Sequence, residues 1–220
     1  MSLSRLSASA PIVLAVSLLC GCAFTDVRID LPKRAWLTKQ ALAKGRPVVV
    51  HVPFEDGRKI RDRCGMQKNG YNMDTADALC QQDPAEWIAK QLAAELTLAG
   101  FEVLATDAPH EPGTLEIEGS LLKIFIEPVI GMWTGSLEAD LDVKLVVSTE
   151  DGLRAEREFF VKGIQGGQMV SLPFAYQLAL DHATESIMRE MVLAIVELTS
   201  RYPTDSAAPT DAAAASGDPR

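Results

Sequence analysis

The sequence predicts an α+β domain: a two-layer sandwich in which a mixed, mostly antiparallel sheet of about five strands carries two helices on one face. Two segments repeat apolar residues at the helical period, and five others have the length and patterning of strands. They follow one another in the order β-α-β-β-β-β-α. A run of strands joined by short turns, bracketed by helices, is typical of α+β architecture.

The first strand is expected over residues 48–54, where β-branched residues face both sides of the chain as in a central strand. The first helix is expected after Asp83, because an acidic N-cap is followed by proline at the first helical position and by Glu86. Gly100 ends this helix in the C′ position. A second strand is predicted over residues 101–106.

Three longer strands follow. Alternation from Leu115 changes phase between Leu121 and Leu122, which predicts a β-bulge or a change of buried face. Residues 137–147 alternate leucine, alanine and valine with charged residues, which indicates one buried and one solvated face. The sequence Glu150-Asp151-Gly152 predicts a hairpin turn into a last strand over residues 155–161.

The last predicted helix runs from Leu172 to about Ser200. Its apolar stripe has helical spacing and consists of Tyr176, Leu180, Ala183, Ile187, Met191, Ala194 and Leu198. Residues 203–220 contain proline, serine, aspartate and an alanine run, a composition typical of a disordered tail. The folded domain is therefore expected to cover residues 47–202.

The first 21 residues have the order of an export signal: Arg5 precedes an apolar run that is too short and interrupted to span a membrane well. This run ends in Leu19-Cys20-Gly21-Cys22, which resembles the bacterial lipobox and implies lipidation, including palmitate, on Cys22. Ala23 after the cysteine implies transfer to the outer membrane under the sorting rule of enteric bacteria. Residues 22–46 are then a lipidated tether, with room for a short strand or helix against the domain.

The composition is that of an ordinary globular protein, with 47% hydrophobic and 23% charged residues. Lysine and arginine number 21 against 30 aspartate and glutamate residues. Such an acidic chain is a poor partner for nucleic acid, and none is expected.

Two of the four cysteines remain available for pairing, because Cys20 would be removed with the signal and Cys22 would be acylated. Cys64 and Cys80 would lie in an oxidising compartment, so we expect a disulfide between them. Neither has a second cysteine or a histidine at the spacing of a zinc site, and no metal is expected.

No catalytic set is evident, and the chain is expected not to be an enzyme and to need no cofactor. His51, His110 and His182 fall on a strand, a loop and a helix without a spacing relation. The acid pairs Glu116/Glu118 and Asp140/Asp142 are two apart on predicted strands, which places each pair on the solvated face.

Two segments stand out. The connection Pro128–Gly135 is apolar, so it either folds back onto the core or forms an exposed contact patch of Val129, Ile130, Met132 and Trp133. Arg58, Lys59, Arg61, Arg63 and Lys68 make a basic loop on an acidic protein. A solvated loop is the favoured interpretation; the alternative is a site for an anionic glycan, a lipid headgroup or an acidic partner.

Several of these features together resemble the YajG-type family of bacterial lipoproteins. They are the strand and turn over residues 50–58, the helix from Trp87 to Gly100 with Phe101-Glu-Val after it, the strand around Ile117-Glu-Gly119, and the helix of Tyr176. The loop from Lys59 to Gln82 departs from shorter members of that family. The resemblance implies a periplasmic protein anchored in the outer membrane, and supplies no catalytic residues.

The expected function is that of a non-enzymatic lipoprotein on the periplasmic face of the outer membrane. It would be an interaction or accessory subunit of a cell-envelope assembly, with a protein partner at the Val129–Trp133 patch. The alternative is an auxiliary lipoprotein of a lipid or small-molecule transporter that binds an apolar ligand between helices and sheet. An enzyme of cell-wall metabolism ranks last.

Overall fold

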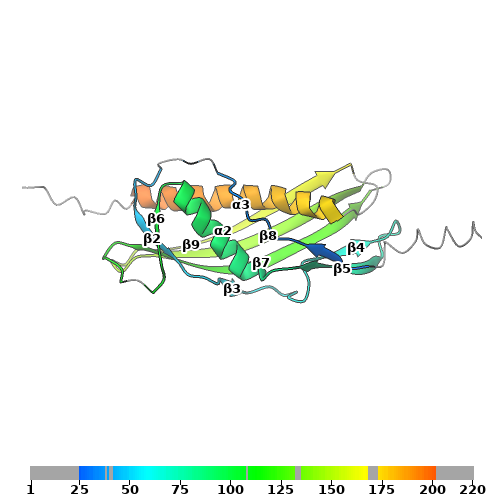
Figure 1. The fold of residues 1–220 in the computed structure, drawn as a ribbon, viewed down its shortest axis with the longest axis horizontal. Helices are drawn as coiled ribbons and strands as arrows, with labels where there is room; N and C mark the ends of the chain where they lie inside the picture. The colour runs from blue at the N-terminus through cyan, green and yellow to red at the C-terminus, as the bar shows by residue number, and fades with distance from the viewer. Residues whose placement is uncertain are drawn as a thin grey trace, which may run out of the picture.

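The computed structural model describes residues 25–37, 39, 42–107, 109–131, 135–167 and 173–201. Over these residues the chain forms one sheet and two helices, α2 (Pro84–Leu98) and α3 (Pro173–Arg201) (Figure 1). The expected signal, the lipidation site Cys22, Met132, Trp133 and the expected tail lie outside the described residues. The strands are β1 (Val27–Ile29), β2 (Pro47–Val50), β3 (Glu55–Asp56), β4 (Gly65–Lys68), β5 (Asp74–Cys80), β6 (Glu102–Leu104), β7 (Leu115–Ile130), β8 (Gly135–Ser148) and β9 (Arg154–Gly166).

The described part of the sheet has nine strands, so the expectation of about five was wrong. The missed strands β1, β3, β4 and β5 are short or polar: β1 alternates over only three residues, and the other three carry no sustained apolar alternation. The sheet is mixed as expected. Its long pairings, β7 with β8 and β8 with β9, are antiparallel, whereas five short pairings of the described strands are parallel.

The long strands follow the sequence pattern closely. On β8 the inward residues from Leu137 to Val147 are buried at every second position, as the alternation predicted. The pairing of β7 with β8 shifts register between Leu121 and Lys123, so of the two alternatives the bulge is present. The predicted hairpin turn is also present, with Gly152 at a φ of +96°.

Both helices pack on the face of the sheet that carries these inward residues (Figure 1). Helix α2 begins as predicted: Asp83 Oδ1 accepts a 2.8 Å hydrogen bond from the backbone N–H of Ala85. Helix α3 lies so close to β9 that a Cβ atom on Gly163 would be 2.1 Å from the carbonyl oxygen of Ala179. Glycine is therefore required where this helix crosses the strand.

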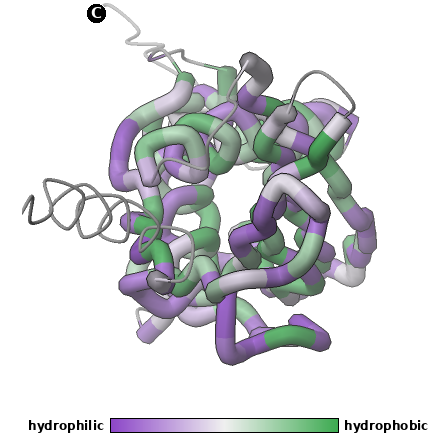
Figure 2. The backbone as a smooth tube through the Cα atoms, turned by 90° about the vertical axis from the view of Figure 1, so that its right-hand side faces the viewer, coloured by the Kyte–Doolittle hydropathy of each residue, from purple (hydrophilic) through white to green (hydrophobic). Residues whose placement is uncertain are grey.

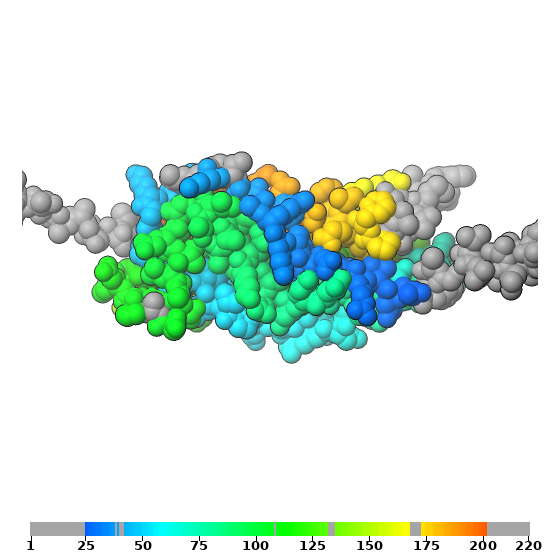
Figure 3. Space-filling view, in the orientation of Figure 1, coloured from blue at the N-terminus to red at the C-terminus, as the bar shows by residue number. Residues whose placement is uncertain are grey.

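The segment before β2 lies against the domain rather than away from it. Strand β1 pairs in parallel with β5, and the indole Nε1 of Trp87 donates a 2.7 Å hydrogen bond to the carbonyl of Pro32. The wholly buried Glu95 accepts hydrogen bonds from the backbone N–H groups of Trp36 and Leu37. In the space-filling view this blue segment lies across α2 and the start of α3 (Figure 3).

Candidate functional site

The strand directions bring several distant segments to one end of the sandwich. Strand β4 runs parallel to β7, β5 runs antiparallel to β4, and β1 runs parallel to β5. The first described residue, Thr25, therefore lies at the same end as the end of β7, the end of β9, the start of α3 and the turn between β4 and β5 (Figure 1). The side chain of Gln67 on β4 donates a hydrogen bond to the carbonyl of Thr25, which holds the chain entry there.

Exposed apolar side chains gather at this end, which we call the apolar end. Its members are Tyr71, Met73, Val129, Ile130, Ile164, Phe174 and Leu178, and their exposed fractions range from 37% to 87%. Figure 2 views the molecule from this end, where hydrophobic and hydrophilic segments are interspersed. Large exposed apolar patches mark protein or membrane contact sites, so the apolar end is the first candidate site.

The apolar end contains half of the contact patch predicted from the sequence. Val129 is 42% exposed and Ile130 is 38% exposed, while Met132 and Trp133 lie outside the described residues. Phe174 and Leu178, four residues apart and off the buried stripe of α3, were missed. Their spacing was a usable signal, but only the topology shows that they lie at the same end as Val129.

Two lysines at this end are paired with carboxylates. Lys68 Nζ lies 2.5 Å from a carboxylate oxygen of Glu127, and Lys162 pairs with Glu138. The hydrogen bond with Glu138 raises the pKa of Lys162 above its usual value. These ion pairs lower the free-energy cost of bringing the apolar end close to a membrane or another apolar surface.

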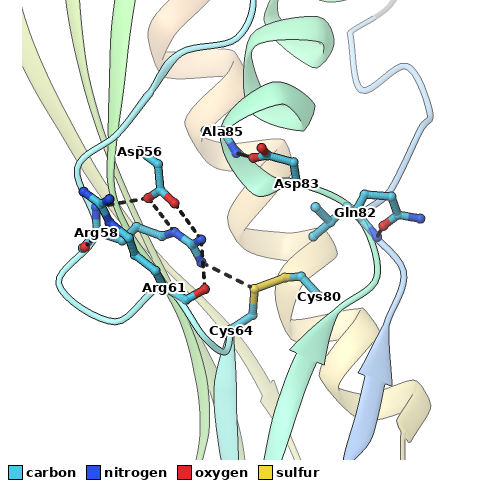
Figure 4. The surroundings of a disulfide bond; sticks show 9 residues. Asp56, Arg58, Arg61, Cys64, Cys80, Gln82, Asp83 and Ala85 are labelled. Carbon is cyan, nitrogen blue, oxygen red and sulfur yellow. Dashed lines mark hydrogen bonds and ion pairs between the residues drawn. A yellow bond between two sulfur atoms is a disulfide. The ribbon is translucent and has the colours of Figure 1, made fainter.

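Cys64 and Cys80 form the expected disulfide, which closes a loop with a sequence separation of 16 (Figure 4). The guanidinium of the buried Arg58 lies between the disulfide and Asp56, with Nη1 3.8 Å from Cys64 Sγ and Nε 2.8 Å from Asp56 Oδ1. This hydrogen bond lowers the pKa of the Asp56 carboxyl. The arrangement anchors the loop that leads from β3 to β4.

The same contacts explain most of the basic loop noticed in the sequence. Arg58 pairs with Asp56, Arg63 with Asp77, and Lys68 with Glu127. The Asp77 hydrogen bond also raises the pKa of Arg63. Three of the five basic side chains therefore have carboxylate partners within the domain, which favours a structural role over an anion-binding one.

A second candidate is a cleft between the last turns of α3 and the ends of β8 and β9 nearest the Glu150–Gly152 turn. Its volume is about 230 Å³. The guanidinium of Arg157 at the cleft lies 5.1 Å from the ring centroid of Phe159. The lining is Leu145, Val147, Ala155, Glu156, Arg157, Phe159, Ala194, Ile195, Glu197, Leu198 and Arg201. No sequence feature predicted this cleft, because its lining residues follow ordinary strand and helix patterns.

The three histidines do not come together. His51 Nε2 lies 3.7 Å from Glu116, whereas His182 Nδ1 lies 3.0 Å from the carbonyl oxygen of Ile164. Over the described ranges, no group of three or more histidine, cysteine, aspartate or glutamate side chains is arranged to hold a metal ion. Nor does any helix within those ranges have the length and apolar character needed to cross a membrane.

The acid pairs lie on the outer face of the sheet, as predicted. Asp140 pairs with Lys123 at 2.5 Å and with Lys162 at 3.5 Å. Asp142 Oδ1 has no hydrogen-bond partner, and burial together with the nearby Glu158 carboxylate raises the pKa of Asp142. These contacts give no geometry for acid–base catalysis on a bound substrate.

No protein-family model matches the chain, and no curated protein matches it. Solved structures similar to the chain include protein XCC0632 of the DUF330 family from Xanthomonas campestris, at 12% identity and a TM-score of 0.48, covering 80% of this chain and 98% of that one. A neuraminyllactose-binding hemagglutinin homologue from Helicobacter pylori matches at 9% identity and a TM-score of 0.38, covering 78% and 95%.

A minor lipoprotein from Acinetobacter baumannii matches at 13% identity and a TM-score of 0.32, covering 52% of this chain and 83% of that one. At such low identities and TM-scores, none of these likenesses assigns a family or transfers a function. The functional reasoning therefore depends on the chain's own residues.

Proposed function

We propose that the chain is a non-enzymatic lipoprotein, acylated on Cys22 and held on the periplasmic face of the outer membrane. There it serves as an interaction or accessory subunit of a cell-envelope assembly. The observation that carries this proposal is the position of Thr25. This residue enters the domain at the apolar end and is three residues after Cys22 of the lipobox-like segment. The anchor and the exposed apolar side chains would then face the same membrane.

Two further observations support the proposal. The Cys64–Cys80 disulfide suits an oxidising compartment such as the periplasm. Of the segments that carry the YajG-type resemblance, the helix from Trp87 is present in α2, whereas residues 50–58 form only the last residue of β2 and the short strand β3. Membership of that family is part of the proposal.

The test is fractionation and crosslinking of the intact protein in cells. We expect the wild-type protein to be in the outer-membrane fraction, and Cys22→Ser to be unprocessed and absent from it. A photo-crosslinking residue at Val129 should capture a component of the outer membrane, whereas one at the exposed Leu42, elsewhere on the surface, should not. Outer-membrane placement of Cys22→Ser would contradict the anchor.

A second function, binding of a small apolar ligand, is favoured by the cleft beside Arg157. Apolar side chains from α3 and β8, together with Arg157 in the lining, suit an amphiphile that carries an anionic group. The volume of about 230 Å³ lies below the usual range of roughly 300–1,000 Å³ for ligand pockets, which ranks this function second. Mass spectrometry of lipid extracted with the purified protein tests it, with Phe159→Trp as the variant that fills the cleft.

A further inference from the structure

We propose that the apolar end rests on the lipid bilayer itself, with its side chains in the headgroup region. This inference deepens the proposed function and rests on the lipidation of Cys22. It names lipid, rather than a protein, as what the apolar end touches.

The first step is the length of chain between the anchor and the domain. Three peptide units link Cys22 to Thr25, and an extended chain spans at most about 3.6 Å per residue, so the two residues are separated by no more than about 11 Å. An acylated Cys22 lies at the bilayer surface. The domain therefore cannot lie far from the membrane, and the end nearest the membrane is the one that contains Thr25.

The second step is that Thr25 is held in place. Strand β1 pairs with β5 directly after it, and the N–H of Asp77 donates a 3.1 Å hydrogen bond to Asp26 Oδ1. Further along, the buried carboxylate of Glu95 binds the backbone at Trp36 and Leu37. Because the segment is fixed at several points, it does not detach to lengthen the link to Cys22. The apolar end therefore stays close to the bilayer.

The third step is the chemistry of the exposed side chains. Tyr71, at the turn between β4 and β5, is 87% exposed, and Met73 beside it is 57% exposed. Phe174, in the first turn of α3, is 53% exposed. An aromatic ring with a polar group suits the headgroup level, and aliphatic side chains gain by leaving water there.

The fourth step is charge. Lys68 pairs with Glu127, and Lys162 with Glu138, so the positive charge of these two lysines is neutralised within the domain. The chain as a whole has a formal charge of −9. The contact is therefore apolar rather than electrostatic, and zwitterionic lipid should suffice.

Helix α3 offers a matched pair of positions for the test. Phe174 is 53% exposed and Leu193 is 55% exposed, but they are 19 residues apart, or about 28 Å along the helix. Only Phe174 belongs to the apolar end. A cysteine introduced at either position can be labelled selectively, because Cys64 and Cys80 are paired and Cys22 is acylated in the mature protein.

The experiment uses the full-length acylated protein with Phe174→Cys, Met73→Cys or Leu193→Cys, each labelled with a fluorophore. The proteins are reconstituted in phosphatidylcholine/phosphatidylethanolamine vesicles that contain a lipid with a quencher near the headgroup. We expect quenching at Phe174→Cys and Met73→Cys to exceed that at Leu193→Cys about threefold or more, since interfacial burial reaches only roughly 5–10 Å into the bilayer.

The outcomes separate the two proposals. Vesicle binding with equally weak quenching at all three positions would overturn the bilayer contact while leaving the anchor in place. Failure of the acylated protein to bind vesicles would overturn the anchor, and the inference with it. A third outcome is that the label at Phe174→Cys is shielded from water only after an envelope extract is added and is not quenched by the lipid. This would also overturn the bilayer contact, because a protein would then cover the apolar end.

Discussion

The backbone N–H of Trp36 donates a 2.8 Å hydrogen bond to Glu95 Oε1, a carboxylate oxygen of a wholly buried residue on α2. The other carboxylate oxygen accepts the N–H of Leu37 at 3.0 Å, and Gln91 donates to the first. A buried carboxylate is costly unless its oxygens are hydrogen-bonded. Glu95 thus stabilises the docked position of the N-terminal segment, which in turn fixes where the chain enters the domain.

Glu95→Ala should loosen this segment. Removing the carboxylate leaves the N–H groups of Trp36 and Leu37 without their hydrogen-bond acceptor. The free energy of unfolding should fall by about 1–3 kcal/mol. Amide exchange at Trp36 and Leu37 should accelerate more than exchange in the sheet. Glu86→Ala on the exposed face of the same helix is the control, with a loss below about 1 kcal/mol. Unchanged exchange at Trp36 in Glu95→Ala would contradict the role of the carboxylate.

Gly163→Ala should destabilise the packing of α3 on β9. The new Cβ would meet two backbone atoms, the Ala179 carbonyl oxygen at 2.1 Å and the Ala183 nitrogen at 2.4 Å, so the helix must move. Overpacking of this kind costs about 1–3 kcal/mol, measurable by urea unfolding. Gly166→Ala, on the same strand with no heavy atom within 4 Å, should be neutral. Equal stability of the two variants would show that the contact is not rigid.

Reduction of the disulfide should destabilise the domain. Closing a loop of about 15 residues contributes roughly 3 kcal/mol in the chain-entropy account. The double variant Cys64→Ser/Cys80→Ser should lose a similar amount and become insensitive to dithiothreitol, whereas the wild-type unfolding midpoint should fall on reduction. Alkylation of the wild-type protein without prior reduction should add no mass at Cys64 or Cys80. A mass increase there would mean that the thiols are free.

Asp142→Asn should stabilise the domain at neutral pH. Burial first, and then the Glu158 carboxylate, raise the pKa of Asp142 above its ordinary value of 3.8. The folded state therefore binds a proton more tightly than the unfolded state, and stability falls as pH rises through the raised pKa. The variant should gain up to about 0.5 kcal/mol at pH 7, and this gain should vanish below about pH 4.

Its neighbour on the same face provides the contrast. Asp140 is paired with Lys123 and Lys162, so Asp140→Asn should lose about 0.2–1 kcal/mol at pH 7. Urea unfolding at several pH values measures both variants. A gain for Asp142→Asn that persists unchanged at pH 3 would show that titration of this carboxyl is not its cause.

Much of the fold could be predicted from local patterns. The alternation of β8, the cap at Asp83 and the stripe of α3 each predicted an element that the structure contains, and α3 spans Pro173–Arg201 where residues 172–200 were expected. These elements bury one face, so their own sequences carry the period. Strand β4 pairs with β7, and β5 pairs with β4. These two strands are defined by their backbone pairing, and their sequences contain no apolar period to detect.

The candidate site was predictable only in part, for a related reason. Val129 and Ile130 were identified because an apolar tip is unusual in a hairpin. Tyr71 and Phe174 are ordinary when considered alone, in a turn and on a helix. They become part of one surface only in the folded chain: parallel pairing of β4 with β7 places the Tyr71 turn at this end, and a hydrogen bond from the Tyr176 hydroxyl to the Met66 carbonyl places the start of α3 beside β4.

The lipid anchor is the central claim, and the mass of the N-terminal peptide from protein extracted from membranes tests it most directly. The account predicts a peptide that begins at Cys22 and carries acyl chains, with residues 1–21 removed. An intact N-terminus that still begins at Met1, or an unmodified Cys22 in membrane-extracted protein, would contradict it.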